Sequence, residues 1–203
     1  MQDKKLPVIA INRECGAGGR TLAVILSERL GIPYYDRDFV SKTAEESGYE
    51  ETEVEAEGEE MSASSKAFNN FLNSVVSYSS SHDAIFKAEK KVILKLAENP
   101  CIMVGRCADR ILAEAGIDVV SIYLHAPLEM RIKRAEELKE SDGEKAEKFV
   151  EKRDSQRRIF YKQYTGSEIF DASNYTFTFD VGRIGIEQCA EIVLNMLENN
   201  KSK

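Results

Sequence analysis

The sequence predicts an α/β protein with a doubly wound parallel sheet of about five strands and helices on both faces. Short apolar runs alternate with segments of helical periodicity, which is the pattern of a parallel sheet covered by helices. Segments rich in glycine and arginine follow these runs, at the edge where such sheets bind ligands. The 203 residues suit one domain, residues 1–203, that needs no disulfide or metal to fold.

Four apolar runs are expected to form strands, at residues 6–11, 101–105, 119–126 and 175–182. Apolar residues at helical spacing predict helices at 20–30, 38–47, around 68–76 and 85–96, and at 108–116, 127–140, 144–163 and 186–199. Gly31 and Pro33 end the first of these helices, and Pro127 lies in the first turn of a later one.

Negative charge is concentrated in one segment. The formal net charge is −7, but residues 45–60 hold nine glutamates and no Lys or Arg, so the rest of the chain carries +2. Because like charges repel, we expect this acidic segment to be a solvated, mobile insert. The clustered arginines elsewhere suit an anionic small molecule. Nucleic acid is not expected as a partner, because no long basic stripe is interleaved with aromatics.

The cysteines and the hydropathy indicate a soluble protein. The four cysteines are scattered without a CxxC or a neighbouring His pair, which argues against a zinc site and a disulfide framework. The first apolar run is too short for a signal peptide, and no stretch approaches the roughly 20 apolar residues of a membrane span. We therefore expect a cytoplasmic protein without a membrane partner, and its oligomeric state stays open.

The segment ECGAGGRT, residues 14–21, has the form of a phosphate-binding loop between a strand and a helix. The P-loop pattern is GxxxxGK[ST]; here Glu14 replaces the first glycine and Arg20 replaces the lysine. The glycines still let backbone N–H groups turn toward an anion at a helix N-terminus. Arg20 keeps a positive charge for the phosphates, and the Thr21 hydroxyl is a candidate Mg²⁺ ligand. The candidate nucleotide-binding residues are Gly16, Ala17, Gly18, Gly19, Arg20 and Thr21. The alternative is a glycine-rich turn that binds nothing.

Four segments, in order, resemble the cytidylate kinase-like family, which belongs to the nucleoside monophosphate kinase group of P-loop proteins. They are INRECGAGGRTLAVILSERLGIPYYDRD (11–38), MVGRCADRIL (103–112), SIYLHAPLEMRIKR (121–134) and KRDSQRRIFYKQYTGSEIFDASNY (152–175). That family has an arginine where other P-loops have lysine, as this chain has at Arg20. The resemblance implies ATP-dependent phosphoryl transfer, with Mg²⁺, to a nucleoside monophosphate, and its name favours CMP.

The resemblance also assigns candidate acceptor residues at two corners of the sheet. PYYDRDFV (33–40) resembles the acceptor-binding stretch, where Asp36 and Arg37 would contact hydroxyls and phosphate. The alternative is a capped helix start over core tyrosines. Arg106 resembles the arginine that grips the acceptor phosphate, a task that suits the fork of a guanidinium. Asp109 would orient Arg106 or read the base, and the alternative is a surface ion pair at this corner.

Two arginine-bearing helices flank a short polar crossing, ESDGEK at residues 140–145. Arg131 and Arg134 share one helical face, and Arg153 and Arg157 share another with Asp154 beside them. Solvated charged helices show the same spacing. The resemblance implies instead a helical lid, about residues 131–158, that delivers arginines to the transferring phosphoryl group. The candidate catalytic residues are Arg20, Arg131, Arg134 and Arg157, and the candidates for acceptor binding on the lid are Arg153 and Asp154.

Other functions stay open from the sequence. A nucleotide-binding regulatory module without turnover is favoured by Glu14, by Arg20 and by the lack of an Mg²⁺-binding acid just after residues 101–105. A kinase of another small acceptor fits the same motifs, and the acidic segment would suit a protein that binds a basic partner. Hydrolase and metalloprotease motifs are missing from the sequence, and its two histidines lie far apart.

Overall fold

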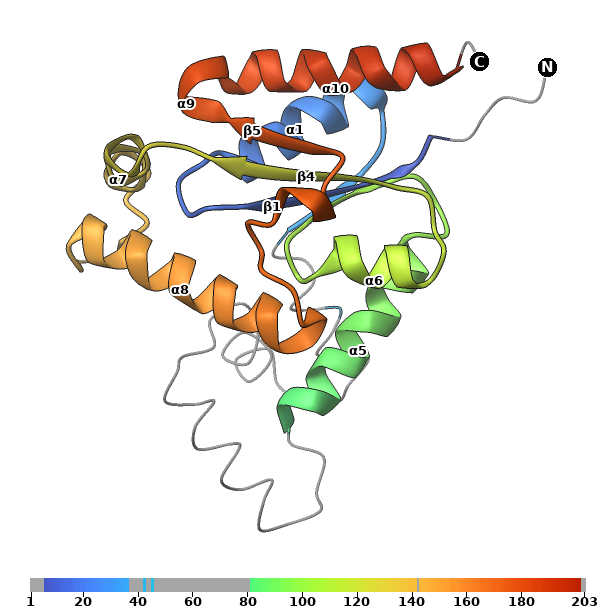
Figure 1. Cartoon of the computed structure of the whole chain (residues 1–203), viewed down its shortest axis with the longest axis horizontal. Coiled ribbons are helices and arrows are strands. Elements are labelled where there is room, and N and C mark those ends of the chain that lie inside the picture. The colour runs from blue at the N-terminus through green and yellow to red at the C-terminus, as the bar shows by residue number, and fades with distance from the viewer. Residues whose placement is uncertain (1–5, 37–41, 43–44, 46–80, 142, 202–203) are drawn as a thin grey trace.

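The computed structural model describes residues 6–36, 42, 45, 81–141 and 143–201. Its centre is a five-stranded sheet with the order β2-β3-β1-β4-β5, in which every neighbouring pair is parallel (Figure 1). The strands are β1 (Val8–Arg13), β2 (Tyr34–Tyr35), β3 (Ile102–Val104), β4 (Val119–His125) and β5 (Phe177–Asp180). The helices are α1 (Gly19–Leu30), α5 (Ser81–Leu96), α6 (Ala108–Glu114), α7 (Leu128–Glu137), α8 (Ala146–Thr165), α9 (Val181–Ile184) and α10 (Ile186–Lys201), with a 3₁₀ helix η1 at Ala172–Asn174.

Helices cover the sheet on both faces. In Figure 1, α1 and α10 lie above the sheet and α5, α6 and α8 lie below it. One apolar cluster joins α1 and α10 to the upper face around Ile9 and Ile11, and a second joins the helices below to Ala10 and Met103. Because β1 is buried on both faces, its first four residues, at positions 8–11, are all apolar. The predicted doubly wound parallel fold is confirmed.

The strand predictions hold with one addition. The four predicted runs correspond to β1, β3, β4 and β5, and β5 is shorter than expected because α9 begins at Val181. The added strand, Tyr34–Tyr35, pairs with β3 and is too short to show a period of its own. The predicted helix at 38–47, the helical segment around 68–76, Arg37 and nearly all of the acidic segment lie outside the described residues.

Two further observations concern the cysteines and the apolar character of the helices. The four cysteines, Cys15, Cys101, Cys107 and Cys189, are free and buried, so none of them forms a disulfide. No helix among the described residues is long and apolar enough to cross a membrane.

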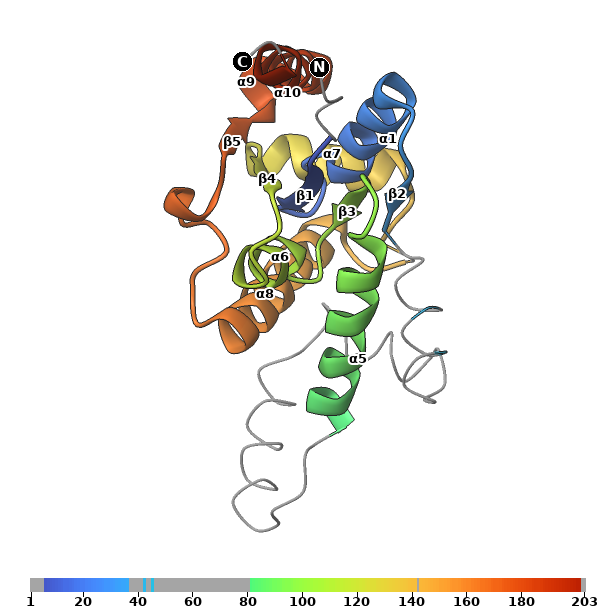
Figure 2. The ribbon, with the colours of Figure 1, turned by 90° about the vertical axis from the view of Figure 1, so that its right-hand side faces the viewer.

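Helix α8 contacts both the loop after β1 and the core below the sheet. Near its start, Val150 packs with Cys15 and Ala135 in a small apolar cluster. Near its end, Phe160 and Tyr161 are buried in the cluster beneath the sheet. Figure 2, turned by a quarter from Figure 1, shows α8 running beneath α6. The polar side chains of α8 are therefore held at a fixed distance from the carboxyl ends of the strands.

Candidate functional site

Glycines shape the turn from β1 into α1. Gly16 and Gly18 have φ values of 78° and 90°, in the left-handed region that glycine enters without strain. A Cβ atom at Gly16 would lie only 2.6 Å from the carbonyl oxygen of Arg131, so the loop passes directly against α7. At Gly19, where α1 begins, a Cβ atom would lie 3.0 Å from Cγ of Arg13. The loop therefore has room for glycine alone at its closest approach to α7.

A buried arginine holds this loop from behind. Arg131 is 7% exposed; its Nε donates to the carbonyl of Ala126 at 3.0 Å and its Nη1 to the carbonyl of Cys15 at 3.2 Å. Its Nη1 also lies 2.6 Å from Oδ2 of Asp154, and its Nε lies 3.1 Å from Oε2 of Glu14. The other carboxylate oxygen of Asp154 accepts the backbone N–H of Cys15 at 2.6 Å. Arg131 and Asp154 thus tie the loop to α7 and α8.

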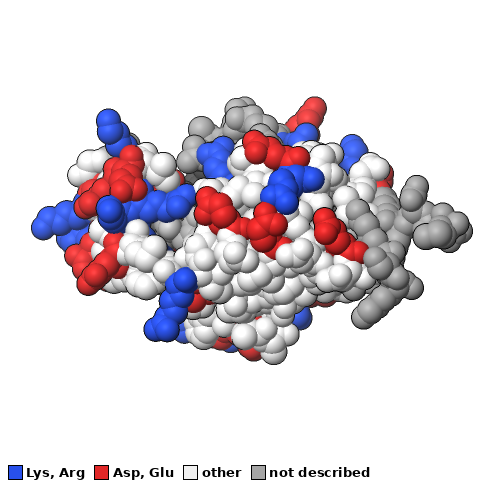
Figure 3. Space-filling view, turned by 90° about the horizontal axis from the view of Figure 1, so that it is seen from above, with Lys and Arg blue, Asp and Glu red and all other residues white. Residues whose placement is uncertain are grey.

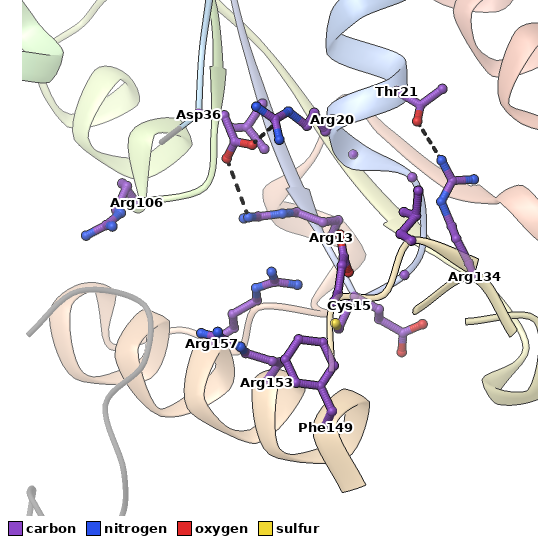
Figure 4. A pocket seen from close by; sticks show the side chains of 17 residues that line it. Arg13, Cys15, Arg20, Thr21, Asp36, Arg106, Arg134, Phe149, Arg153 and Arg157 are labelled. Atoms are coloured by element: carbon purple, nitrogen blue, oxygen red, sulfur yellow. Dashed lines mark hydrogen bonds and ion pairs between the residues drawn. The ribbon is translucent and has the colours of Figure 1, made fainter. Parts of the chain in front are cut away.

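A cavity of about 560 Å³ opens on the other side of the loop. It is lined by Arg13, Glu14, Cys15, Gly16, Gly18, Gly19, Arg20, Thr21, Asp36, Val104, Arg106, Arg134, Leu138, Glu140, Phe149, Arg153 and Arg157 (Figure 4). Six of these residues are arginines and three are acids, so the wall has an excess of positive charge that attracts anions. On the outer face seen in Figure 3, by contrast, side chains of both signs are intermixed.

The arginines of the wall come from several elements and converge on the loop. Nη2 of Arg134, on α7, donates to Oγ1 of Thr21 at 2.6 Å. The carboxylate of Asp36, just after β2, lies 3.7 Å from Nε of Arg20 and 4.0 Å from Nη2 of Arg13. Figure 4 shows Asp36 between these two arginines. The predicted loop residues other than Ala17 therefore share one cavity with Asp36. Ala17 is buried in the core above the sheet and does not line the cavity.

The acceptor corner places one predicted residue on the wall and the other behind it. Arg106, after β3, lines the cavity and pairs with Glu89 of α5. Asp109 is 2% exposed, accepts a hydrogen bond from the Tyr161 hydroxyl at 2.7 Å and is not among the lining residues. Burial raises the pKa of Asp109, and the bond from Tyr161 opposes this rise. Asp109 therefore packs beneath the corner.

The arginines of α8 face the cavity from below. Arg153 and Arg157 both line it, and the guanidinium of Arg153 lies 5.3 Å from the centre of the Phe149 ring. A guanidinium over an aromatic face is an attractive cation–π contact, which restricts the orientations that Arg153 can take. The structure thus brings together the predicted residues Arg20, Thr21, Asp36, Arg106, Arg134, Arg153 and Arg157 around one cavity.

Comparison with known proteins identifies the family. A model of the cytidylate kinase-like family matches residues 8–183, which is most of the chain. The chain belongs to the cytidylate kinase-like family. No curated protein matches its sequence. The cytidylate kinase-like resemblance expected from the four motifs is therefore confirmed.

Solved structures of several other proteins share the fold of this cytidylate kinase-like chain. An uncharacterized protein from Eubacterium ventriosum ATCC 27560 matches with a TM-score of 0.70 and 20% identity, over 95% of this chain and 98% of that one. A shikimate kinase from Acinetobacter baumannii, in complex with shikimate, has a TM-score of 0.55 and 17% identity, over 98% and 96% of the two chains. A gluconokinase from Sinorhizobium meliloti 1021 has a TM-score of 0.55 and 10% identity with the same coverage. The fold is thus that of the P-loop kinases.

Two side-chain oxygens on the cavity wall are of the kind that would hold a magnesium ion together with phosphates, although arginines contact both of them here. Mg²⁺ in nucleotide sites takes one or two protein oxygens and completes its shell with phosphates and water. The Thr21 hydroxyl and the Asp36 carboxylate, both on the cavity wall, are such oxygens. Among the described residues, no group of three or more His, Cys, Asp or Glu side chains is placed to hold a metal by itself.

Several residues of the site carried little signal in the sequence. Arg13 and Glu14 precede the glycines, and their position in the family's opening pattern could have indicated them. Glu89 and Phe149 lie in helical segments without a motif, so no local pattern distinguishes them. Cys15, inside the loop, is not a nucleophile candidate, because burial raises the pKa of its thiol and favours the protonated form.

Proposed function

We propose that the protein transfers the γ-phosphoryl group of ATP to a nucleoside monophosphate, with CMP as the first acceptor to test. The observation that carries this proposal is a single cavity in which the glycine loop faces arginines from the β3 corner, from α7 and from α8. Phosphoryl transfer depends on positioning and on neutralising the charge of the phosphates, and little covalent work falls to the protein. A wall of six arginines supplies that neutralisation.

The loop side of the cavity suits the donor nucleotide. Backbone N–H groups at the start of α1 and the helix dipole attract phosphate oxygens, and Arg20 adds a full positive charge. The guanidinium of Arg134 lies 3.8 Å from where a Cβ atom of Gly18 would be, so it sits directly over the loop. Magnesium bound with ATP would be held by Thr21 and Asp36, and it would neutralise charge on the phosphates.

The opposite side of the cavity suits the acceptor. Arg106 and Arg157 would bind its phosphate, with Arg153 beside them on α8. A phosphate oxygen of a nucleoside monophosphate is already an anion at neutral pH, so it attacks without a general base. The protein then needs only to hold the two phosphate groups in line and to keep out water.

Two predicted residues receive positioning roles in this proposal. Arg131 was expected to contact the transferring group, but its contacts with Glu14, Cys15, Ala126 and Asp154 hold the loop instead. Asp154 shares that work through the backbone N–H of Cys15. Both act on the phosphates through the shape of the loop.

A kinase of a small hydroxyl acceptor is the second candidate, and one observation favours it. A hydroxyl must lose its proton as it attacks, which requires a base. The Asp36 carboxylate lies on the cavity wall between Arg13 and Arg20, so it is placed to accept such a proton. The shikimate kinase and gluconokinase that share the fold are named for acceptors of this kind.

The test is ADP release from Mg-ATP with CMP, dCMP, UMP, AMP, GMP, shikimate, gluconate or no acceptor. Turnover that depends on a monophosphate supports the proposal, and turnover with a hydroxyl acceptor selects the second candidate. ATP binding without turnover across the panel would leave a regulatory module as the better description. A chain that binds no ATP would contradict all three.

The loop assignment is tested separately with Arg20→Ala. Removing this guanidinium should abolish measurable ATP binding in calorimetry, because it supplies the charge that a P-loop lysine supplies elsewhere. Arg29→Ala is the matched control, since Arg29 lies on the same helix and pairs with Glu191 on the surface. Unchanged ATP affinity in Arg20→Ala would refute the assignment.

A further inference from the structure

A buried glutamate lies behind the acceptor corner. Glu89, on α5, is 1% exposed, and its carboxylate pairs with a terminal guanidinium nitrogen of Arg106. An ionised carboxylate is costly to bury unless it is paired and hydrogen-bonded. The side chain of Arg106 is 11% exposed and lines the cavity, so one guanidinium connects the buried acid to the ligand space.

The backbone of this corner is strained. Gly105, Arg106 and Cys107 have φ values of 80°, 58° and 55°, so three successive residues are left-handed. The last two are not glycines, and an L-residue adopts this conformation only with steric strain. Such strain persists where neighbouring contacts determine it, and it is frequent at ligand sites. Here the Cys107 side chain is buried in the lower core, and the pair with Glu89 fixes Arg106.

The backbone turn and the ion pair with Glu89 both constrain the side chain of Arg106. The left-handed turn sets where the Arg106 side chain leaves the backbone, and Glu89 sets where its guanidinium ends. A guanidinium has five N–H donors in a rigid fork, so it can serve a carboxylate on one edge while it presents others to a second anion. An arginine held in this way loses little side-chain freedom when an anion binds.

Resting on the phosphotransfer proposed above, we infer that Glu89 is a positioning residue for the acceptor: it holds Arg106 in the orientation that binds the acceptor's anionic group. Glu89 does not line the cavity, so it would act on the acceptor through Arg106. We therefore expect its effect on the acceptor side and none on ATP binding at the loop.

The test compares Glu89→Gln with the wild-type chain. Glutamine keeps the volume and one oxygen but loses the charge that orients the guanidinium. Glu89→Gln should raise the acceptor KM about tenfold, the size of one charge-assisted hydrogen bond, with ATP affinity changed less than about twofold. Arg106→Lys should raise the acceptor KM at least as much. The double variant should be no worse than Arg106→Lys alone, because the two residues act as one unit.

A matched control lies next to Glu89, between α5 and α6. Lys90 and Glu114 form an exposed ion pair between α5 and α6, with Nζ of Lys90 3.7 Å from Oε2 of Glu114. Glu114→Gln should leave both the acceptor KM and the ATP affinity unchanged. A purely structural role for Glu89 predicts something different, namely a lower unfolding free energy with an unchanged acceptor KM.

Binding without turnover separates this inference from the function it rests on. Calorimetry with CMP alone gives the affinity of wild-type chain and Glu89→Gln. Weaker CMP binding by Glu89→Gln supports the inference even if the wild-type chain transfers no phosphate, in which case only the proposed function fails. Equal CMP binding by the two chains overturns the inference while leaving phosphotransfer in place. Tighter binding by Glu89→Gln overturns it too, because Glu89 would then compete with the ligand for Arg106.

Discussion

The loop after β1 and the corner after β3 each place an arginine on the cavity wall, but their backbone turns are made by different residues. Both lie at the carboxyl ends of neighbouring parallel strands, both make left-handed turns, and both place an arginine on one cavity. The loop makes its turns with Gly16 and Gly18, which tolerate them without strain. The corner makes two of its turns with Arg106 and Cys107, which do not. The loop therefore turns without strain and is held from behind by Arg131 and Asp154. The corner turns with strain, and its arginine is held by Glu89 of α5.

The largest expected loss of ATP affinity and stability comes from adding one methyl group to the loop after β1. In Gly16→Ala, the new Cβ atom would lie 2.6 Å from the carbonyl oxygen and 2.9 Å from Cα of Arg131, at a residue with φ of 78°. Backbone atoms of α7 cannot yield cheaply, so the loop must shift. We expect ATP affinity to fall roughly 100-fold in calorimetry, and the free energy of unfolding in urea to fall by about 2–4 kcal/mol.

Gly31→Ala is the control for this loop variant. Gly31 is also left-handed, with φ of 66°, but nothing lies within 4 Å of a Cβ atom there. Its alanine variant should lose about 1 kcal/mol of stability from backbone strain alone and keep its ATP affinity. Equal losses of ATP affinity in the two variants would show that strain, and not the approach to α7, governs the loop.

The next largest effect should come from releasing the loop from α8. In Asp154→Asn, the charge that pairs with Arg131 and accepts the N–H of Cys15 is removed. We expect a loss of about 1–3 kcal/mol of unfolding free energy and roughly tenfold weaker ATP binding, because the buried guanidinium loses an ionic acceptor. Urea unfolding and calorimetry measure the two.

Glu168→Gln provides the matched control for Asp154. Glu168 also pairs with an arginine of α8, Arg158, at 3.3 Å, but in an exposed position. Exposed ion pairs are screened by water, so this variant should leave ATP binding unchanged. If Asp154→Asn binds ATP as tightly as Glu168→Gln does, the tie between Asp154 and the loop is not needed for the loop's shape.

The same contrast explains what the sequence could and could not predict. The fold could be predicted because β1, β3 and β4 are mostly apolar, and the loop could be predicted because glycines at fixed spacing mark it. Arg131 and Arg134 are both arginines on one helix, so their spacing could not distinguish them. Arg131 is buried behind the loop, whereas Arg134 lies over it. That difference depends on which acceptors α8 and the loop bring near, and those are tertiary contacts.

The acceptor corner was harder to predict for the same physical reason. Glu89 lies in a helical segment where a charged residue is normally solvated, and its burial results from the packing of α5 against the corner. The resemblance assigned Asp109 to orienting Arg106 or reading the base, but the first turn of α6 directs its side chain into the core beside Tyr161. A side chain's direction on a short helix is set by the helix's orientation, which the sequence leaves open.

The smallest expected effect is a pH dependence of stability, and it concerns the acceptor corner rather than the loop after β1. Burial raises the pKa of Asp109 above its ordinary value of 3.8, so the folded chain holds this proton to higher pH than the unfolded chain. Stability from the group is complete below the ordinary pKa and is lost as pH rises through the folded pKa. The Asp109→Asn variant does not lose stability in this way, because asparagine does not ionise. Its unfolding free energy relative to the wild-type chain should therefore increase as pH rises from about 4 to 8.

Tyr161→Phe gives a second test of the predicted titration of Asp109. The Tyr161 hydroxyl donates to the Asp109 carboxylate at 2.7 Å, and this bond favours the charged form and lowers the pKa of Asp109. Without it, the folded pKa should rise further, so the loss of stability should extend to higher pH than in the wild-type chain. Urea unfolding across the same pH range measures both variants. A constant offset between Asp109→Asn and the wild-type chain at every pH would mean that Asp109 titrates alike in the folded and unfolded chains, and that the acceptor corner is no more sensitive to pH than the loop.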